Sequence, residues 1–441
     1  MNQSPPVRPP SAGRARGPAR SRVAAWALWD FGATAVNSIA VTFVFSVYLT
    51  GAVGDDLPGG ASPASWLGRA LALAGLVVAL FAPVTGVWVD APGRRRRALA
   101  VLTGVMVLLT ASMSLIRDDH RYLVPGLILL AATAACSELA TVPYNAMLRD
   151  LSTPQTAGRI SGMGLGAGFV GSVLALLIVY VGFVAGDGDN RGLLGLPIAD
   201  GQNVRAAMLL VAGWFALFAL PLIIYGPPGA GGSAQRFGMI GAYRRIWREI
   251  REEWRRDRSV IYYLGASAVF RDGLTGIFTF GAVLGVQVYG ISTADVLLFG
   301  IAACVAAAVG SVFGGQIDDR IGAKRVIVGS LIVMIAIGVA LLVSSGATAF
   351  WILGLLLCLF IGPTMSSART LMMRMSTPGK EGVTFGLYAT AGRAATFLAP
   401  WLFSVFIDVF DSDRAGLAGL LVVLVLGLLA VAAVRLPDTR A

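Results

Sequence analysis

The chain is poor in the residues that catalysis and metal binding use. Its 441 residues include one histidine, His120, and three cysteines, Cys136, Cys304 and Cys358, each inside an apolar run without metal-ligand spacing. It contains no phosphate-binding loop, no nucleophile elbow and no zinc motif. We therefore expect neither an enzyme nor a metal or other cofactor site.

Charge is scarce as well, at 13% of the residues, against about a quarter in a soluble domain. Hydrophobic residues make up 56% of the chain, and its mean hydropathy is +0.76. These values indicate an integral membrane protein surrounded by lipid. Residues 1–22 lack the apolar stretch of a cleavable signal, so we expect a disordered cytosolic tail there.

Twelve stretches are long enough to cross about 30 Å of hydrocarbon as helices. Their expected spans are 23–50, 66–89, 97–116, 122–148, 159–184, 204–225, 260–289, 294–316, 324–345, 347–374, 382–407 and 415–435. We predict an all-α fold of two pseudo-symmetric six-helix bundles. The expected division is an N-terminal bundle at 23–225, a cytosolic linker at 226–259, a C-terminal bundle at 260–435 and a cytosolic tail at 436–441.

The basic residues lie mostly on one side of this topology. With both termini inside, the inner segments hold 26 of the 35 Lys and Arg residues and the outer segments about six. This bias orients the protein with both termini in the cytosol, and we expect a bacterial plasma membrane. The net charge of +11 comes from these short clusters, so we expect lipid contacts and no nucleic-acid partner.

The linker contains an amphipathic helix in the segment YRRIWREIREEWRRDR. One helical face holds Tyr243, Ile246, Trp247, Ile250 and Trp254, and the other is mostly arginine. Tryptophan favours the membrane interface and arginine favours phosphate, so the helix should lie in the plane of the cytosolic headgroups. A calmodulin-target helix has the same pattern.

A short loop signature, G-x-x-x-D-x-x-G with a basic finish, occurs twice, about half a chain apart. The residues are Gly86, Asp90, Gly93, Arg94 and Arg95 in the first copy, and Gly315, Asp319, Gly322, Lys324 and Arg325 in the second. A carboxylate at a helix end, glycines for a tight turn and cations beside headgroups can clamp one helix to its neighbour. The duplication predicts two homologous halves and a gate.

A second echo supports the duplication. MLRDLSTPQTAGRISG after the fourth span corresponds to MMRMSTPGKEGVTFG after the tenth, with Pro154 and Pro378 separated by 224 residues against 229 for the loop signatures. The fifth and eleventh helices should therefore occupy equivalent places. In the fifth, Gly164 and Gly168 form a small-residue face for close helix packing.

These motifs resemble the signature of the major facilitator superfamily. WALWDFGATAVNS at 26–38, FRDGLTGIFTFG at 270–281 and GVTFGLYATAGRAATFLAP at 382–400 resemble its vacuolar amino-acid effluxer-like branch. The resemblance implies a monomeric secondary transporter that moves a small polar solute by alternating access, with protons as the coupling ion and amino-acid-like efflux. Arg271 stands where the branch has a neutral amide, a change that bears on the charge of the solute.

Two alternatives remain open. A sugar/cation symporter of the melibiose-permease kind also has an Asp-containing first helix and a Pro-Tyr pair like Pro143 and Tyr144. A transport-inactive membrane sensor or scaffold could use the same fold. A carrier should depend on its deep charges, whereas a sensor should tolerate their loss.

Polar groups inside the spans are costly unless they are paired or hydrated, so they are the candidates for substrate and proton binding. These candidates are Asp272, Arg271, Glu138, Arg393, Asp30, Asn37, Asn145 and Gln287. We expect Asp272 and Glu138 to be more important for coupling than Asp30, and Arg393 to be the partner of Asp272. The alternatives are a structural ion pair for Asp272 and interhelical hydrogen bonds for the amides.

Overall fold

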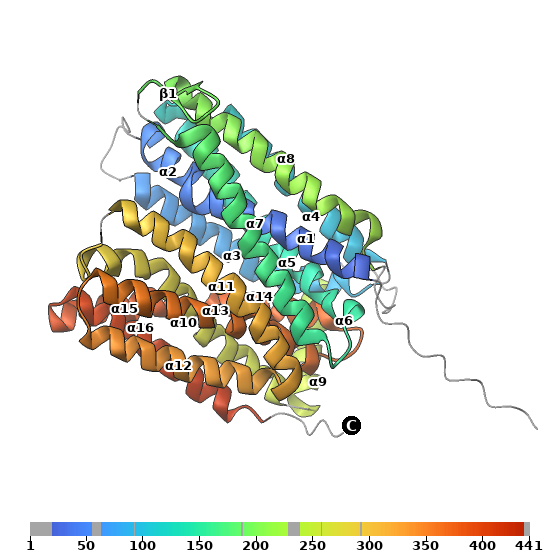
Figure 1. Cartoon of the computed structure of the whole chain (residues 1–441). Coiled ribbons are helices and arrows are strands. Elements are labelled where there is room, and N and C mark those ends of the chain that lie inside the picture. The colour runs from blue at the N-terminus through green and yellow to red at the C-terminus, as the bar shows by residue number, and fades with distance from the viewer. Residues whose placement is uncertain are drawn as a thin grey trace, which may run out of the picture.

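The computed structural model describes residues 20–54, 63–91, 93–186, 188–227, 239–256, 258–291 and 293–435 (Figure 1). The first half comprises α1 (Arg20–Val36), a π-helical turn η1 (Asn37–Phe43), α2 (Phe45–Thr50), η2 (Ala52–Gly54), α3 (Pro63–Val89), α4 (Arg94–Ser112), η3 (Met113–Leu115), η4 (His120–Tyr122), α5 (Leu123–Ala146), α6 (Leu148–Leu151), α7 (Ala157–Val179), η5 (Tyr180–Val184), β1 (Asn190–Arg191), β2 (Leu196–Pro197), η6 (Ala199–Gly201) and α8 (Gln202–Tyr225). The second half comprises α9 (Met239–Arg256), α10 (Arg258–Gln287), α11 (Thr293–Ile321), α12 (Ala323–Val343), α13 (Ala347–Met375), α14 (Glu381–Ala395), α15 (Leu398–Phe410) and α16 (Asp413–Ala433).

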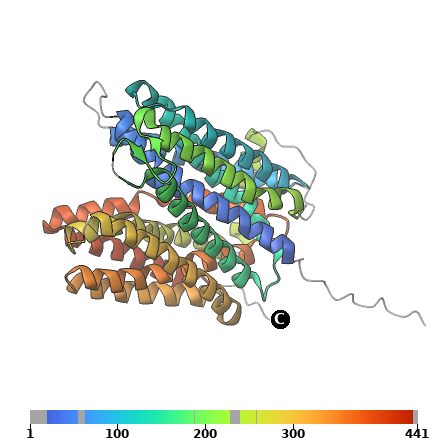
Figure 2. The ribbon, with the colours of Figure 1, turned by 45° about the horizontal axis from the view of Figure 1, so that its top comes forward.

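The helices form two bundles that lie side by side. Helices α1 to α8 form one bundle, and α10 to α16 form the other, as the blue-to-green and yellow-to-red halves of Figures 1 and 2 show. The bundles meet mainly along two pairs of helices, α7 with α11 and α3 with α14. This arrangement places two equivalent seams between the halves.

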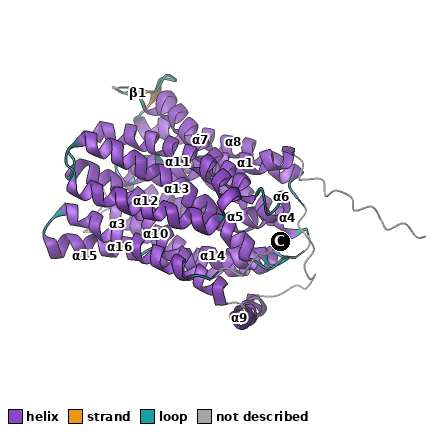
Figure 3. Ribbon diagram, turned by 60° about the horizontal axis from the view of Figure 1, so that its bottom comes forward, coloured by secondary structure: helices purple, strands orange, loops and turns teal. Residues whose placement is uncertain are grey.

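The molecule has two distinct ends. At one end lie α9 and the turns after α3 and α11, and we call this the α9 end; the β1–β2 hairpin marks the other, the hairpin end (Figure 1). Figure 3 views α9 nearly along its axis, whereas the bundle helices run across the view. The amphipathic helix therefore crosses the end of the bundles instead of joining them.

The expected twelve-helix fold is confirmed. Eleven helical segments of the described residues are long and apolar enough to cross a membrane. The twelfth, α10, is 30 residues long and has Arg271 and Asp272 at mid-length. The eleventh span is broken between α14 and α15, and the fifth ends in the π turn η5.

Some expectations about the tails and linker differ from the structure or fall outside it. The first helix begins at Arg20, so Arg20 and Arg22 belong to α1 and not to a disordered tail. Residues 1–19, 228–238 and 436–441 lie outside the described residues.

The outer surface of the bundles is apolar, as expected for a protein surrounded by lipid. Large apolar side chains such as Leu108, Leu217 and Val343 are more than half exposed, which is stable where the surrounding solvent is hydrocarbon. Close packing inside uses small residues instead. A Cβ atom on Gly164 would clash with Trp26, and one on Gly168 would clash with Thr34, so the small-residue face of α7 lets α1 approach as expected.

Candidate functional site

A cavity of about 610 Å³ lies between the two bundles, a size usual for small-molecule sites. Residues of α1, η1, α5 and α7 line it from one half, and residues of α10, α13 and α14 line it from the other. Most of the lining is apolar or aromatic, including Phe169, Phe278 and Met365. The charged lining residues are Asp30, Arg271 and Arg369.

Aromatic packing fixes the position of Asp30. The indoles of Trp26 and Trp29 are fully buried on α1 and stack on the ring of Tyr144, with centroids 4.4 and 4.6 Å away. Trp26 Nε1 donates to Tyr144 O at 3.0 Å, and Trp29 Nε1 donates to Thr103 Oγ1 at 3.0 Å. With α1 held on these faces, Asp30 is directed to the cavity.

Arg369 on α13 faces Asp30 across the cavity floor, and our sequence interpretation did not single it out. Its NH1 lies 3.8 Å from Asp30 Oδ2, and its guanidinium also donates to Ser161 O at 2.6 Å and to Asn145 Oδ1 at 3.3 Å. Asp30 Oδ2 has no hydrogen-bond partner among the described residues. The sequence did contain a signal, because Arg369, with Arg271 and Arg393, is one of three basic residues more than four residues from either end of an expected span.

Arg271 and Asp272 point to different sides of α10, as adjacent helical positions must. Arg271 lines the cavity, and its guanidinium carbon lies 4.0 Å from the ring centroid of Tyr388, whose carbonyl accepts from NH1 at 3.3 Å. Asp272 is buried, and its Oδ2 accepts from the backbone N–H of Ala399 at 2.6 Å. Asp272 is absent from the cavity lining.

The expected partnership between Asp272 and Arg393 was wrong. Arg393 NH2 pairs instead with Glu138 Oε1 at 2.5 Å, which joins α14 to α5 across the seam between the bundles. Asp272 needs no arginine because its carboxylate, which projects from α10, lies against the first turn of α15. Unpaired backbone N–H groups and the helix dipole favour a carboxylate there.

The neutral candidates separate into three places. Asn145 lines the cavity and accepts from Arg369. Asn37 donates to Ser137 Oγ at 2.8 Å, which is the interhelical hydrogen bond that we gave as the alternative. Gln287 is exposed at the last position of α10.

The first loop signature clamps the seam between α3 and α14. Asp90 Oδ1 accepts from the N–H of Gly382 at 2.6 Å, and Oδ2 accepts from that of Val383 at 3.0 Å. The carboxylate of one bundle therefore caps the first turn of a helix in the other bundle.

A buried ionic network surrounds this cap. Arg95 contacts Asp90 at 3.3 Å, Asp150 at 3.1 Å and Glu381 at 2.5 Å, and Arg149 Nε lies 2.8 Å from Glu381. Burial raises the pKa of Asp90 to about 6, although Arg95 and the two backbone donors lower it. Burial also raises the pKa of Asp150. Three carboxylates share two arginines here, so the network can retain a proton.

The second signature forms the equivalent clamp on the seam between α11 and α7. Asp319 Oδ1 accepts from the N–H of Gly158 at 2.7 Å, and Oδ2 accepts from that of Arg159 at 2.9 Å. Arg374 pairs with the fully buried Asp318 at 2.6 Å and donates to Pro154 O at 3.2 Å. Arg149 makes the reciprocal contact, to Met373 O at 2.7 Å and Ser376 O at 2.6 Å.

Glycines allow the backbones to meet at both clamps. Gly86 opposes Gly382, and Gly315 opposes Gly158, each pair across the seam. A Cβ atom on any of the four would collide with a carbonyl oxygen of the other bundle. The two repeated motifs therefore contact each other across the seam. Each loop signature packs on the glycine four residues after the Ser-Thr-Pro proline of the opposite bundle, Gly382 for the first signature and Gly158 for the second.

The remaining signature residues have local roles. Gly93 and Gly322 adopt positive φ angles of 68° and 92°, which favour glycine. Lys324 Nζ donates to Ala432 O and Val434 O at the end of α16, and Arg325 donates to Ile321 O in its own bundle. Of the basic residues in the two signatures, Arg95 is the one that reaches across to Glu381.

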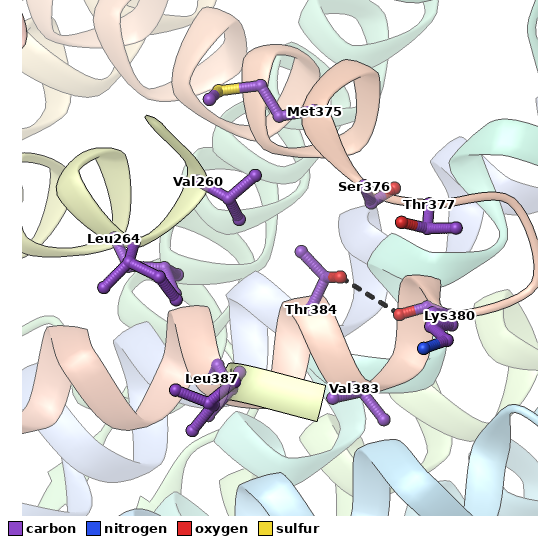
Figure 4. A pocket seen from close by; sticks show the side chains of 11 residues that line it. Val260, Leu264, Met375, Ser376, Thr377, Lys380, Val383, Thr384 and Leu387 are labelled. Carbon is purple, nitrogen blue, oxygen red and sulfur yellow. Dashed lines mark hydrogen bonds between the residues drawn. The ribbon is translucent and has the colours of Figure 1, made fainter. Parts of the chain in front are cut away.

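Helix α9 covers the first clamp. Ile250 packs on Val84, Val87 and Val383, and the Tyr243 hydroxyl donates to Leu80 O. Beside it is a cavity of about 40 Å³ lined by α10, the end of α13 and α14 (Figure 4), where Thr384 Oγ1 donates to Lys380 O at 3.0 Å. The α9 end is thus closed by two clamps and an added helix.

Comparison with known proteins agrees with this architecture. The family model described as vacuole effluxer Atg22 like matches residues 64–440. A Bacillus subtilis protein named as an uncharacterized MFS-type transporter is 21% identical over 407 residues, which cover 92% of this chain and 93% of that one. Autophagy-related protein 22 of Cryptococcus neoformans is 24% identical over 290 residues, covering 61% of this chain and 51% of that one.

Solved structures with the same fold are transporters. The crystal structure of the major facilitator FucP in its outward conformation superposes with a TM-score of 0.72 at 12% identity, covering 94% of this chain and 99% of that one. The proton:xylose symporter XylE gives a TM-score of 0.68 at 16% identity, covering 93% and 94%. These likenesses establish the fold.

Proposed function

The chain belongs to the vacuole effluxer Atg22 like family of major facilitator transporters, and from this we propose that it moves a small polar solute by proton-coupled alternating access. Amino-acid-like efflux is the leading transport reaction. The observation on which this rests is the cavity of about 610 Å³ between two bundles that are clamped together at the α9 end by polar contacts, which can break and re-form.

The clamps suit a gate because their energy depends on conformation. Asp90 and Asp319 each accept two N–H groups of the opposite bundle, and all four hydrogen bonds would be lost together if the bundles separated at the α9 end. A solute that prefers the separated state could then shift the equilibrium. By charge bias, the α9 end faces the cytosol, so the described state is closed to the cytosol.

We assign proton coupling to Asp30. It lines the cavity, one of its carboxylate oxygens has no hydrogen-bond partner among the described residues, and Arg369 lies 3.8 Å away. A carboxyl in contact with both the solute space and a cation can exchange its proton as water access and occupancy change. Glu138 and Asp272 are less suited, because an arginine and a helix start already hold them.

The test is flux in proteoliposomes under an imposed pH gradient, with a panel of amino acids and sugars. Asp30→Asn should lower gradient-driven accumulation at least tenfold and leave solute exchange intact, because asparagine keeps the size of the side chain and cannot carry the proton. His120→Gln, at the hairpin end, is the matched control. Gradient-driven flux retained in Asp30→Asn would contradict the coupling assignment.

The panel also separates the alternative functions. Flux of sugars but not of amino acids would favour the sugar/cation symporter. Absence of flux for every solute, in protein that remains folded, would favour the sensor or scaffold.

A further inference from the structure

Arg271 is a cation in the solute cavity that has no carboxylate partner in the described part of the chain. Among the residues that the structure describes, its contacts are the ring and the carbonyl oxygen of Tyr388. Its guanidinium also lies against Gly392, where an added Cβ would be 3.1 Å from NH1. The planar guanidinium has five N–H donors, and these contacts engage one of them.

The other charges around the cavity compensate one another. Arg369 has Asp30, and Arg393 has Glu138. Asp272, the acid next in sequence, is directed to the start of α15 and satisfied there. With Asp30 ionised, the ionisable side chains that line the cavity have a net charge of one positive unit, and Arg271 is its source.

An uncompensated arginine inside a membrane protein is costly, and such residues usually line a water-filled path or meet a charged ligand. A bound carboxylate would supply the missing counter-ion and could accept two parallel N–H bonds from the guanidinium. The surrounding Phe169, Phe278 and Met365 offer an apolar wall to the rest of the solute.

We propose that Arg271 is the carboxylate-binding residue of the cavity and that the transported solute is an organic anion with a single net negative charge and an apolar body. The proposal rests on the transport function proposed above and narrows its substrate class. N-acylated amino acids fit this description, because they keep the carboxylate and lack the ammonium group. A zwitterion would leave the net charge of the cavity unbalanced.

Four matched probes test the charge requirement on the purified full-length protein. N-acetyl-phenylalanine is an anion, phenylalanine a zwitterion, N-acetyl-phenylalaninamide neutral and phenylalaninamide a cation, all with the same ring. We expect titration calorimetry to give at least tenfold tighter binding for N-acetyl-phenylalanine than for the other three. Equal or weaker binding of the anion would overturn the proposal.

Variants then assign the effect to Arg271. Arg271→Gln should remove the preference for the anion, and Arg271→Lys should keep part of it, since lysine retains the charge but loses the bidentate geometry. Arg244→Gln, on the exposed face of α9, removes the same charge elsewhere and should bind as the native protein does. An unchanged preference in Arg271→Gln would also overturn the proposal.

Failure of this inference differs from failure of the transport function. Binding and counterflow of phenylalanine or a sugar, without the anion, would leave a transporter with a different substrate class. Counterflow of none of the probes or panel solutes would contradict transport itself.

Discussion

Three carboxylates of this protein share one kind of partner, the first turn of a helix. Asp90 accepts from α14, Asp319 from α7 and Asp272 from α15. Such sites stabilise an anion through free N–H groups and the helix dipole, and they need no basic side chain. The surroundings differ nonetheless, because Asp90 lies in a network with two further carboxylates, Asp150 and Glu381.

We expect this network to make the proposed gate sensitive to pH. In the closed arrangement, burial raises the pKa of Asp90 from an ordinary value of 3.8 to about 6. Separation of the bundles would hydrate the carboxyl and return its pKa to the ordinary value. The closed state thus binds the proton more tightly, so falling pH favours closure and this advantage is lost as pH rises through about 6. From pH 7 to pH 5 the shift should be about 1.4 kcal/mol, or roughly tenfold in population.

Spin labels on exposed Arg97→Cys and Arg325→Cys, after replacement of the native cysteines, would report this population as a distance across the α9 end. Asp90→Asn should weaken the pH dependence, because this titrating group is gone while Arg95, Arg149, Asp150 and Glu381 remain. The prediction fails if the distance distribution does not change with pH in the native network.

At the scale of elements, α9 differs from the helices of the two bundles in its direction and in its exposed arginines. It lies across the bundles, seated on the clamp through Ile250, and its Arg244, Arg248, Arg251 and Arg255 are all exposed. Their spacing of four, three and four residues puts them on one face of the helix. Trp247, which is 69% exposed, adjoins this stripe. The combination suits the interface with anionic headgroups.

We therefore expect anionic lipid to hold α9 on the clamp. Amide hydrogen exchange in α9 should be slower in nanodiscs that contain phosphatidylglycerol than in nanodiscs of phosphatidylcholine alone. The expected difference in the free energy of protection is about 1 kcal/mol for each arginine that binds a headgroup. Replacing the four arginines by glutamine should remove the difference. Replacing Arg117 and Arg121 instead, near the hairpin end, is the control. Equal exchange of α9 in both lipids would show that the stripe does not bind headgroups.

At the scale of the whole molecule, the sequence predicted the repeat and the number of helices because both depend on local patterns. Offsets of 229 and 224 residues between the echoes correspond to clamps that are equivalent in space. The pairing of Asp272 could not be read from side chains, since its partner is the backbone N–H of Ala399. The depth of Arg369 in its span was a signal in the sequence, but its pairing with Asp30 depends on where α13 lies relative to α1, which the sequence does not give.

Orientation is the property of the whole molecule that remains a prediction, and it determines whether the clamps close the cytosolic or the outer side. The basic residues of α9 and of the turns after α3 and α11 should stay in the cytosol, where translocation of clustered arginine is disfavoured. In whole cells, a cysteine at His120 should react with an impermeant maleimide, and one at Arg251 should react only after the membrane is opened. Both positions are on turns or surfaces that the structure leaves accessible, so lack of labelling cannot be ascribed to burial. If Arg251→Cys were labelled from outside, the clamps would be the outer gate, and the described state would be closed on the outer side.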